Sequence, residues 1–228
     1  MNNNIEELEK RICYEFKDKN LLIQALTHSS FSNEHKINKP ENYERLEFLG
    51  DAVLELFSSR FLFEKNRDWN EGKLTQKRSS IVCEPTLAYC ARQIGIQEYI
   101  RLGKGEEATG GRNRDSITSD VLEAILGAIY LDGGMDRAKE FVYRFVLEDY
   151  DEKQLFYDSK SILQERVQKD GQTICYRLIK EEGPEHEKIF EIEVLIDGVS
   201  KATGIGKNKK AAEQQAAYAV LTNWKETI

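Results

Sequence analysis

The stretch ERLEFLGDAVL, residues Glu44–Leu54, places three acidic residues along one side of an apolar segment. Glu44, Glu47 and Asp51 lie at positions i, i+3 and i+7, which at about 100° per residue fall within roughly 60° of arc on a helix. Most of the remaining circumference is apolar, so the pattern predicts a helix that is buried or nearly so. Carboxylates on such a helix repel one another and lose hydration, so they need compensating positive charge.

A second acidic pair stands at the front of a second apolar segment. Asp120 and Glu123 lie at i and i+3 around the start of the predicted helix Val121–Leu131, where small residues permit close approach of another helix. Salt bridges and a shared cation could each compensate the carboxylates. The cation is favoured because Arg45 is the only basic residue inside either apolar run. Oxygen ligands without histidine indicate a hard ion such as Mg²⁺ or Mn²⁺, and the Glu-x-x-His of di-iron bundles is absent.

Apolar residues recur at helical spacing through the first two thirds of the chain. The predicted helices are Leu21–Leu26, Leu46–Phe63, Leu74–Val82, Thr86–Ile94, Val121–Leu131 and Ala138–Leu147. The segment Glu148–Tyr157 is acidic and has no clear period, so the domain boundary is placed there. The fold class expected for the whole chain is mainly α, with an all-α domain over residues 1–152.

The period changes in the last third. A helix from Asp158 or Ser159 to about Lys169 precedes three strands, and a helix from about Lys209 to Trp224 follows them. The predicted strands are Thr173–Lys180, Lys188–Ile196 and Val199–Ile205, with Asp197-Gly198 as a hairpin turn. This order predicts a small α+β domain, α-β-β-β-α, over residues 158–228.

Composition sets wide bounds. The chain has 228 residues, of which 40% are hydrophobic and 32% charged, typical of a soluble protein with a real core. It has no apolar run long enough to span a bilayer, and its start is unlike a secretory signal, so a cytoplasmic location is expected. The four scattered cysteines are expected to be reduced and idle. The net charge of −7 argues against a nucleic-acid partner, but most of the acid excess precedes Asp158.

In contrast to the acidic first part of the chain, the start of the last predicted helix is strongly basic. Asn208 is a good N-cap, yet Lys207, Lys209 and Lys210 crowd the positive end of the helix dipole. Each cation there is disfavoured by a few tenths to about 1 kcal/mol. Phosphates docking at this end would be bound by the lysines, the backbone amides and the dipole together. The cluster therefore predicts a phosphate-binding surface.

Glu44–Leu54 resembles the defining stretch of the ribonuclease III family. Further stretches agree in the same order along the chain: ALTHSS at Ala25–Ser30, EGKL at Glu71–Leu74, the glycine-rich segment Arg101–Arg112, and SDVLEAILGAIYLDGG at Ser119–Gly134. GIGKNKKAAEQQAA at Gly204–Ala217 resembles a double-stranded-RNA-binding domain. The resemblance implies an all-helical endonuclease domain followed by a domain that binds duplex RNA.

The resemblance also implies roles for individual residues. The residues that match Mg²⁺ ligands, with Mn²⁺ as a possible substitute, are Glu47, Asp51, Asp120 and Glu123. Asp51 and Glu123 would be the catalytic pair, and Glu44 and Glu71 would be supporting acidic residues. The implied RNA contacts are Gln164, Gln168, His186, Lys207, Asn208, Lys209 and Lys210. Phe48 matches an aromatic residue that inserts into a partner subunit of a homodimer, although core packing is the alternative for this side chain.

By the same resemblance, the implied reaction is hydrolysis of double-stranded RNA, leaving 5′-phosphate and 3′-hydroxyl ends with short 3′ overhangs. The implied substrates are ribosomal RNA precursors and some mRNAs. The glycine-rich segment lacks the Gly-Lys-Ser/Thr ending of an ATP loop, so no nucleotide cofactor is expected, and either phosphodiester contact or a plain surface loop remains open. His28 is expected to be structural. Two rival functions also remain open, a non-catalytic regulator that binds double-stranded RNA and a phosphohydrolase of small molecules.

Overall fold

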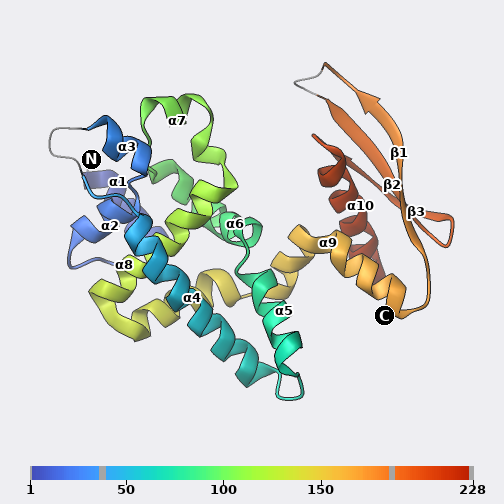
Figure 1. The fold of residues 1–228 in the computed structure, drawn as a ribbon, viewed down its shortest axis with the longest axis horizontal. Helices are drawn as coiled ribbons and strands as arrows, with labels where there is room; N and C mark the ends of the chain where they lie inside the picture. The colour runs from blue at the N-terminus through green and yellow to red at the C-terminus, as the bar shows by residue number, and fades with distance from the viewer. Residues whose placement is uncertain (1, 36–39, 185–187, 226–228) are drawn as a thin grey trace. The chain divides into compact units, whose positions relative to one another are not determined.

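The chain divides into two compact units, Met1–Tyr150 and Asp151–Ile228, in a computed structural model that describes residues 2–35, 40–184 and 188–225 (Figure 1). The first unit is helical. Its helices are α1 (Asn2–Arg11), α2 (Lys19–Ala25), α3 (Ser29–Glu34), α4 (Glu44–Lys65), α5 (Glu71–Ile81), α6 (Glu84–Ile94), α7 (Lys104–Ala108) and α8 (Asp115–Val142). Short 3₁₀ turns lie at Ile96–Tyr99 and Gly111–Asn113, and a π-helical turn lies at Tyr143–Leu147.

Helices α4 and α8 form the centre of this unit and lie side by side (Figure 1). Leu54 and Phe57 of α4 are buried, as are Val121 and Ile125 of α8, and these side chains join one hydrophobic core. Helix α8 breaks at Gly134, whose φ of +78° lies in the left-handed region that glycine adopts without strain. The sequence predicted a break at this place.

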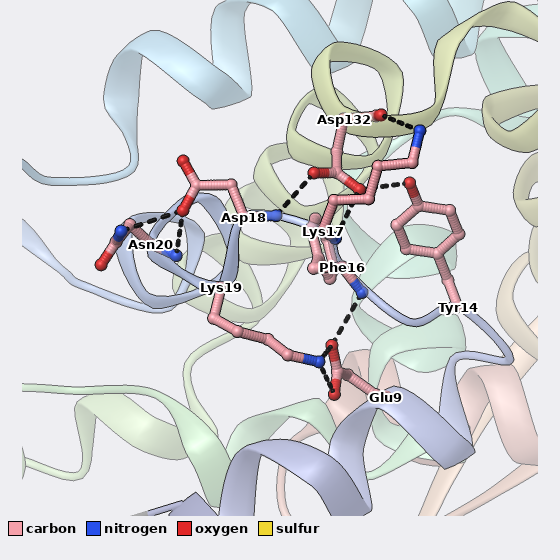
Figure 2. Close-up of polar contacts among 8 residues, drawn as sticks. All are labelled: Glu9, Tyr14, Phe16, Lys17, Asp18, Lys19, Asn20 and Asp132. Atoms are coloured by element: carbon pink, nitrogen blue, oxygen red, sulfur yellow. Dashed lines mark hydrogen bonds and ion pairs between the residues drawn. The ribbon is translucent and has the colours of Figure 1, made fainter.

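The Asp132 side chain, just before that break, holds the turn between α1 and α2. Its carboxylate accepts hydrogen bonds from the Tyr14 hydroxyl at 2.6 Å, the Lys17 amide at 3.0 Å and the Asp18 amide at 2.9 Å (Figure 2). The buried Glu9 carboxylate holds the other side of the turn. Glu9 is buried and Asp132 half-buried, so these hydrogen bonds replace hydration that the carboxylates lose on folding.

The second unit consists of α9 (Tyr150–Lys169, whose first residue belongs to the first unit), β1 (Ile174–Glu182), β2 (Ile189–Ile196), β3 (Val199–Gly206) and α10 (Lys209–Lys225). The strands form one antiparallel sheet in the order β1-β2-β3, and α9 and α10 contribute to its separate core. Asp197 and Gly198 join β2 to β3 with φ of +50° and +77°, as a two-residue hairpin turn requires. The predicted mainly α fold with a small α+β domain is confirmed.

Three local predictions were wrong or incomplete. Helix α4 is not buried on most sides, because Phe48 is 80% exposed, Phe63 71% and Leu56 49%. The segment Glu148–Tyr157 is helical from residue 150 onward, and the helix is interrupted at Asp158, where φ is −126° and ψ is 29°. Helices α1, α3 and α7 were not predicted from the spacing of apolar residues. Within the described residues, no helix is long and apolar enough to cross a membrane.

Candidate metal centre

Three carboxylates from two helices converge in the first unit. Glu47 lies on α4, and Asp120 and Glu123 lie about one turn apart on α8. One carboxylate oxygen from each residue lies within 4.8 Å of the other two, and all three side chains are half-buried. The structure thus brings together three of the four residues that the sequence predicts as metal ligands.

Two glycines allow the helices to approach so closely. A Cβ atom at Gly50 would lie 1.8 Å from the carbonyl oxygen of Glu123, and one at Gly127 would lie 2.2 Å from the carbonyl oxygen of Leu46. Both contacts are with backbone atoms, which cannot move aside as a flexible side chain can. Glycine is therefore required at both positions for α4 and α8 to pack backbone to backbone, and this packing sets the spacing of the three carboxylates.

The cluster is electrostatically strained in the absence of a cation. Burial raises the pKa of Glu123 to about 8, with further contributions from Asp51, Asp120 and Glu47. Burial and the charges of Asp120, Glu44 and Asp51 raise the pKa of Glu47 to about 7. Burial also raises the pKa of Asp120 and of Asp51. All four shifts have the direction expected for like charges crowded in a site of low polarity.

The donor set fits a hard divalent cation. None of the carboxylates of Glu47, Asp51, Asp120 and Glu123 forms an ion pair with lysine or arginine in the part of the chain that the structure describes. This observation argues against the salt-bridge alternative. A cation would remove the repulsion, and a set of carboxylate oxygens suits Mg²⁺ or Mn²⁺ better than a soft metal.

The other predicted acidic residues lie outside the three-residue cluster. Asp51 is exposed and follows Glu47 by about one turn of α4, close enough for its charge to raise the pKa of Glu47 and Glu123. Glu44 precedes Glu47 on the same helix and is also exposed. Glu71 begins α5, where its carboxylate accepts a hydrogen bond from the Thr75 hydroxyl at 3.0 Å.

Sequence reasoning missed the residues that support Asp120. The Tyr43 hydroxyl donates a hydrogen bond to Asp120 Oδ2 at 3.3 Å, and Tyr43 itself is only 4% exposed. The Ser119 hydroxyl lies 3.5 Å from the other carboxylate oxygen. The signal in the sequence that could have indicated this contact was the large aromatic residue directly before Glu44. His28 is structural, as expected, because its Nδ1 accepts a hydrogen bond from the Ser30 amide and caps α3.

The basic residues of the glycine-rich segment mostly have partners within the unit. The Arg101 guanidinium lies over the Phe31 ring, 4.3 Å from its centroid, and Arg112 and Arg114 form ion pairs with glutamates of α7. Lys104 is exposed. Three of the four cations are therefore engaged internally, which favours a folded surface loop over a dedicated phosphate-binding loop.

The predicted RNA-binding residues of the second unit lie at its surface. Gln164 and Gln168 are exposed about one turn apart on α9. In the sheet, Phe190 pairs with Gly206, so the start of β2 and the start of α10 lie at the same end. The β1–β2 loop therefore ends beside the lysine cluster. His186, in this loop, lies outside the described residues.

The lysine cluster at the start of α10 has the geometry predicted for it. Lys207, Asn208, Lys209 and Lys210 are all exposed. Asn208 caps the helix, because its Oδ1 accepts a hydrogen bond from the Ala211 amide at 2.8 Å. Three cations thus surround a helix N-terminus whose first amides point outward, an arrangement suited to an anionic ligand.

Family comparisons agree with this division of the chain. Residues 18–150, more than half of the sequence, match the family described as ribonuclease-III-like. The chain belongs to the ribonuclease III family. Residues 159–223 match the double-stranded RNA binding motif. The carboxylate cluster lies within the ribonuclease-III-like part, and the exposed lysines lie within the double-stranded RNA binding motif.

Similar proteins cover nearly the whole chain. A protein named ribonuclease 3 from Caldanaerobacter subterraneus subsp. tengcongensis is 49% identical over 219 residues, which cover 94% of this chain and 96% of that one. Another from Geobacillus thermodenitrificans is 48% identical, covering 95% and 89%. The solved nuclease domain of ribonuclease III from Campylobacter jejuni is 44% identical with a TM-score of 0.59, covering 64% of this chain and 99% of that domain; its description refers to a region involved in dimer formation.

Proposed function

We propose that this member of the ribonuclease III family is an endoribonuclease that hydrolyses phosphodiester bonds in double-stranded RNA with Mg²⁺. The main support for this proposal is the carboxylate cluster. Oxygen atoms of Glu47, Asp120 and Glu123 lie within 4.8 Å of one another, and these side chains have no basic partner among the described residues. The match to the double-stranded RNA binding motif supports duplex RNA as the substrate. A protein that only bound RNA would have no need to hold three half-buried carboxylates against one another.

Glu47, Asp51, Asp120 and Glu123 would hold the cation, with Asp51 and Glu123 most important for catalysis. When bound, a divalent ion neutralises phosphate charge and lowers the pKa of coordinated water. The chain supplies the rigid α4–α8 frame, and the burial and like charges that raise the pKa of Glu123 without metal are what a bound cation would compensate. Glu44 and Glu71 are proposed as supporting acidic residues.

The second unit would dock the duplex. Lys207, Lys209 and Lys210 would contact phosphates at the start of α10, with Asn208 presenting the helix amides. Gln164 and Gln168 would reach the minor groove, whose 2′-hydroxyls distinguish RNA from DNA. His186, which lies outside the described residues, is proposed as a further minor-groove contact on the family resemblance alone. Because these contacts involve backbone and shape, little dependence on base sequence is expected.

Phe48 is proposed as a dimer anchor. Its side chain is 80% exposed, and Leu56 and Phe63 lie within about 80° of it around α4 and are also exposed. Exposed aromatic and aliphatic side chains on one helix face are typical of an interface between subunits. A two-fold homodimer would present two carboxylate clusters, one for each strand of a duplex, and so would give the short 3′ overhangs implied by the family.

The product ends, the cellular substrates, the alternative metal and the location are proposed only from the resemblance to the ribonuclease III family. The products would carry 5′-phosphate and 3′-hydroxyl ends, and the substrates would include ribosomal RNA precursors and some mRNAs. Mn²⁺ would substitute for Mg²⁺, and the protein would act in the cytoplasm. No nucleotide cofactor is proposed.

The deciding experiment compares cleavage of end-labelled duplex RNA with cleavage of the same strand alone. Wild-type protein with Mg²⁺ should cut the duplex and leave the single strand, and a chelator should stop the reaction. Glu123→Gln should bind the duplex with wild-type affinity in gel retardation but cut it at least 100-fold more slowly. Asp136→Asn serves as a matched control, since it removes an exposed carboxylate of α8 outside the three-residue cluster, and should keep the wild-type rate.

Other outcomes would favour the rival functions. Duplex binding by the wild type without any cleavage in Mg²⁺ or Mn²⁺ would favour a non-catalytic regulator that binds double-stranded RNA. Cleavage by Glu123→Gln at the wild-type rate would contradict the metal assignment. Hydrolysis of small phosphate esters, with no preference for duplex RNA, would favour a phosphohydrolase.

A further inference from the structure

Tyr43 links the carboxylate cluster to a segment that has no other role in the proposed reaction. Its hydroxyl donates a hydrogen bond to Asp120 Oδ2 at 3.3 Å. Because Tyr43 is the residue just before α4 and Asp120 lies on α8, the bond connects the start of one helix to the other. Tyr43 is 4% exposed, so water cannot easily replace this bond. The hydroxyl of a buried tyrosine needs a partner, and Asp120 provides it.

The Thr27–His28 segment, within the ALTHSS stretch, fixes Tyr43 from the other side. The Tyr43 amide donates to the Thr27 carbonyl oxygen at 2.9 Å, and the His28 ring centroid lies 5.6 Å from that of Tyr43. Thr27 is fully buried. His28 is held in turn, because its amide donates to the Arg101 carbonyl oxygen at 3.0 Å. The tyrosine therefore has a fixed backbone and a packed ring, and its hydroxyl position is determined.

We propose that Tyr43 is a positioning residue for the metal centre: anchored by Thr27 and His28, it orients the Asp120 carboxylate toward Glu47 and Glu123. This inference rests on the proposed metal-dependent function. The hydroxyl bonds Oδ2 of Asp120 at 3.3 Å and so restrains the carboxylate rotamer, while the Ser119 hydroxyl lies 3.5 Å from Oδ1. Outer partners of this kind set the affinity of a metal site by holding its ligands in place before the ion arrives.

The Tyr43→Phe substitution tests the role directly, because it removes the hydroxyl and keeps the packed ring. Titration of the metal-free full-length protein with Mn²⁺ by calorimetry should give about tenfold weaker binding than the wild type, within the range found for outer partners of metal ligands. The Mg²⁺ concentration for half-maximal cleavage should rise by a similar factor. The rate at saturating Mg²⁺ should return to within a few-fold of the wild type, since a weaker site can still be filled.

Tyr14→Phe is a matched control. Tyr14 also donates its hydroxyl to an aspartate on α8, Asp132 at 2.6 Å, but that aspartate lies about 18 Å along the helix from Asp120. Both variants lose one tyrosine–aspartate hydrogen bond, so both should lower the melting temperature. Only Tyr43→Phe should weaken Mn²⁺ binding. Equal Mn²⁺ affinity in Tyr43→Phe and the wild type would overturn the proposal, as would an equal loss in the two variants.

A double-mutant cycle with Asp120→Asn separates this inference from the proposed function. If Tyr43 acts through Asp120, adding Tyr43→Phe to Asp120→Asn should change Mn²⁺ affinity by less than about twofold. A further tenfold loss in the double variant would overturn the positioning role while leaving the metal centre intact. Failure of the wild type to bind Mn²⁺ at all would overturn the proposed metal centre together with this inference.

Discussion

Gly50 of α4 lies against the carbonyl oxygen of Glu123 on α8, so closely that a Cβ atom would be 1.8 Å away. The backbone of one ligand-bearing helix thus touches the other at the turn that carries a proposed catalytic carboxylate. The position of Glu123 relative to Glu47 depends on this contact. Gly50 adds no chemical group to the centre, yet it determines whether the centre can form.

Gly50→Ala should therefore push the two helices apart. Overpacking of a tight contact costs about 1–3 kcal/mol of stability, and the carboxylate spacing should widen with it. We expect a lower midpoint of denaturant unfolding and at least tenfold weaker Mn²⁺ binding. Gly105→Ala is the control, because a Cβ atom there meets nothing within 4 Å. Unchanged Mn²⁺ affinity in Gly50→Ala would mean that the helix contact does not set the ligand spacing.

The raised pKa values of Glu47 and Glu123, about 7 and 8, predict a pH dependence of stability without metal. In the unfolded state each glutamate has its ordinary pKa of about 4.3. Both groups therefore bind a proton more tightly in the folded state than in the unfolded state. The stability they contribute is complete below about pH 4 and is lost as pH rises through 7 and 8. The metal-free protein should thus melt at a lower temperature at pH 8.5 than at pH 6.

Added Mg²⁺ should reverse most of this loss, because the cation compensates the ionised carboxylates. Scanning calorimetry across this pH range, with and without chelator, measures the effect. Glu123→Gln should flatten the dependence in chelator, whereas Glu71→Gln should keep the wild-type profile. A melting temperature that rises from pH 6 to pH 8.5 without metal would show that other groups dominate.

Asp132 should contribute strongly to the stability of the first unit. Its carboxylate accepts three hydrogen bonds from the segment Tyr14–Asp18 (Figure 2). Asp132→Ala leaves those donors without their acceptor, and we expect a loss of roughly 2–4 kcal/mol, since hydrogen bonds to a charged group are worth about 1.5–3 kcal/mol each and partly overlap. Asp136→Ala, on the same helix but exposed, should change stability by less than about 0.5 kcal/mol. Urea unfolding provides both values.

Lys209→Gln should weaken binding to duplex RNA and lower its dependence on salt. Removal of one lysine–phosphate interaction should reduce the slope of log K against log salt by about 0.9, the value for duplex DNA. Lys201→Gln removes an equal charge from β3, near the hairpin end of the sheet, and should leave the slope unchanged. Equal effects of the two substitutions would indicate that general charge, and not the start of α10, binds the phosphates.

Phe48→Glu should convert a dimer to monomers. A charge at the centre of an apolar interface loses its hydration without a partner, which costs several kcal/mol of association free energy. Light scattering at micromolar concentration measures the mass. Val199→Glu, at another exposed apolar position that is 57% exposed, is the control and should not change it. A wild type that is already monomeric would contradict the proposed anchor.

The sequence predicted the features that depend on local pattern. Acid pairs on two apolar segments, with Arg45 as the only basic residue in either, predicted that acids of the two helices share a cation; the structure brings Glu47, Asp120 and Glu123 together and leaves Asp51 outside their cluster. The Asp197-Gly198 turn followed from the residue types alone. These features need only the periodicity of one element and the chemistry of its side chains.

Other features depend on contacts between distant segments and could not be predicted. The family resemblance implied that Phe48 is exposed, but the apolar pattern of α4 alone left core packing open, because exposure depends on which face of the helix its neighbours leave uncovered. The bond from Tyr43 to Asp120 joins residues 77 positions apart. Helix α3 has six residues and is held partly by the His28 cap, so it carries too few apolar positions for its period to be read.

Among the residues that the structure describes, the hydrophobic cores of the two units have no member in common. A substitution that loosens one core therefore has little direct effect on the packing of the other. Substitutions in the core of the second unit can therefore change the proposed docking of RNA while the packing of α4 against α8, which spaces the three carboxylates, stays intact.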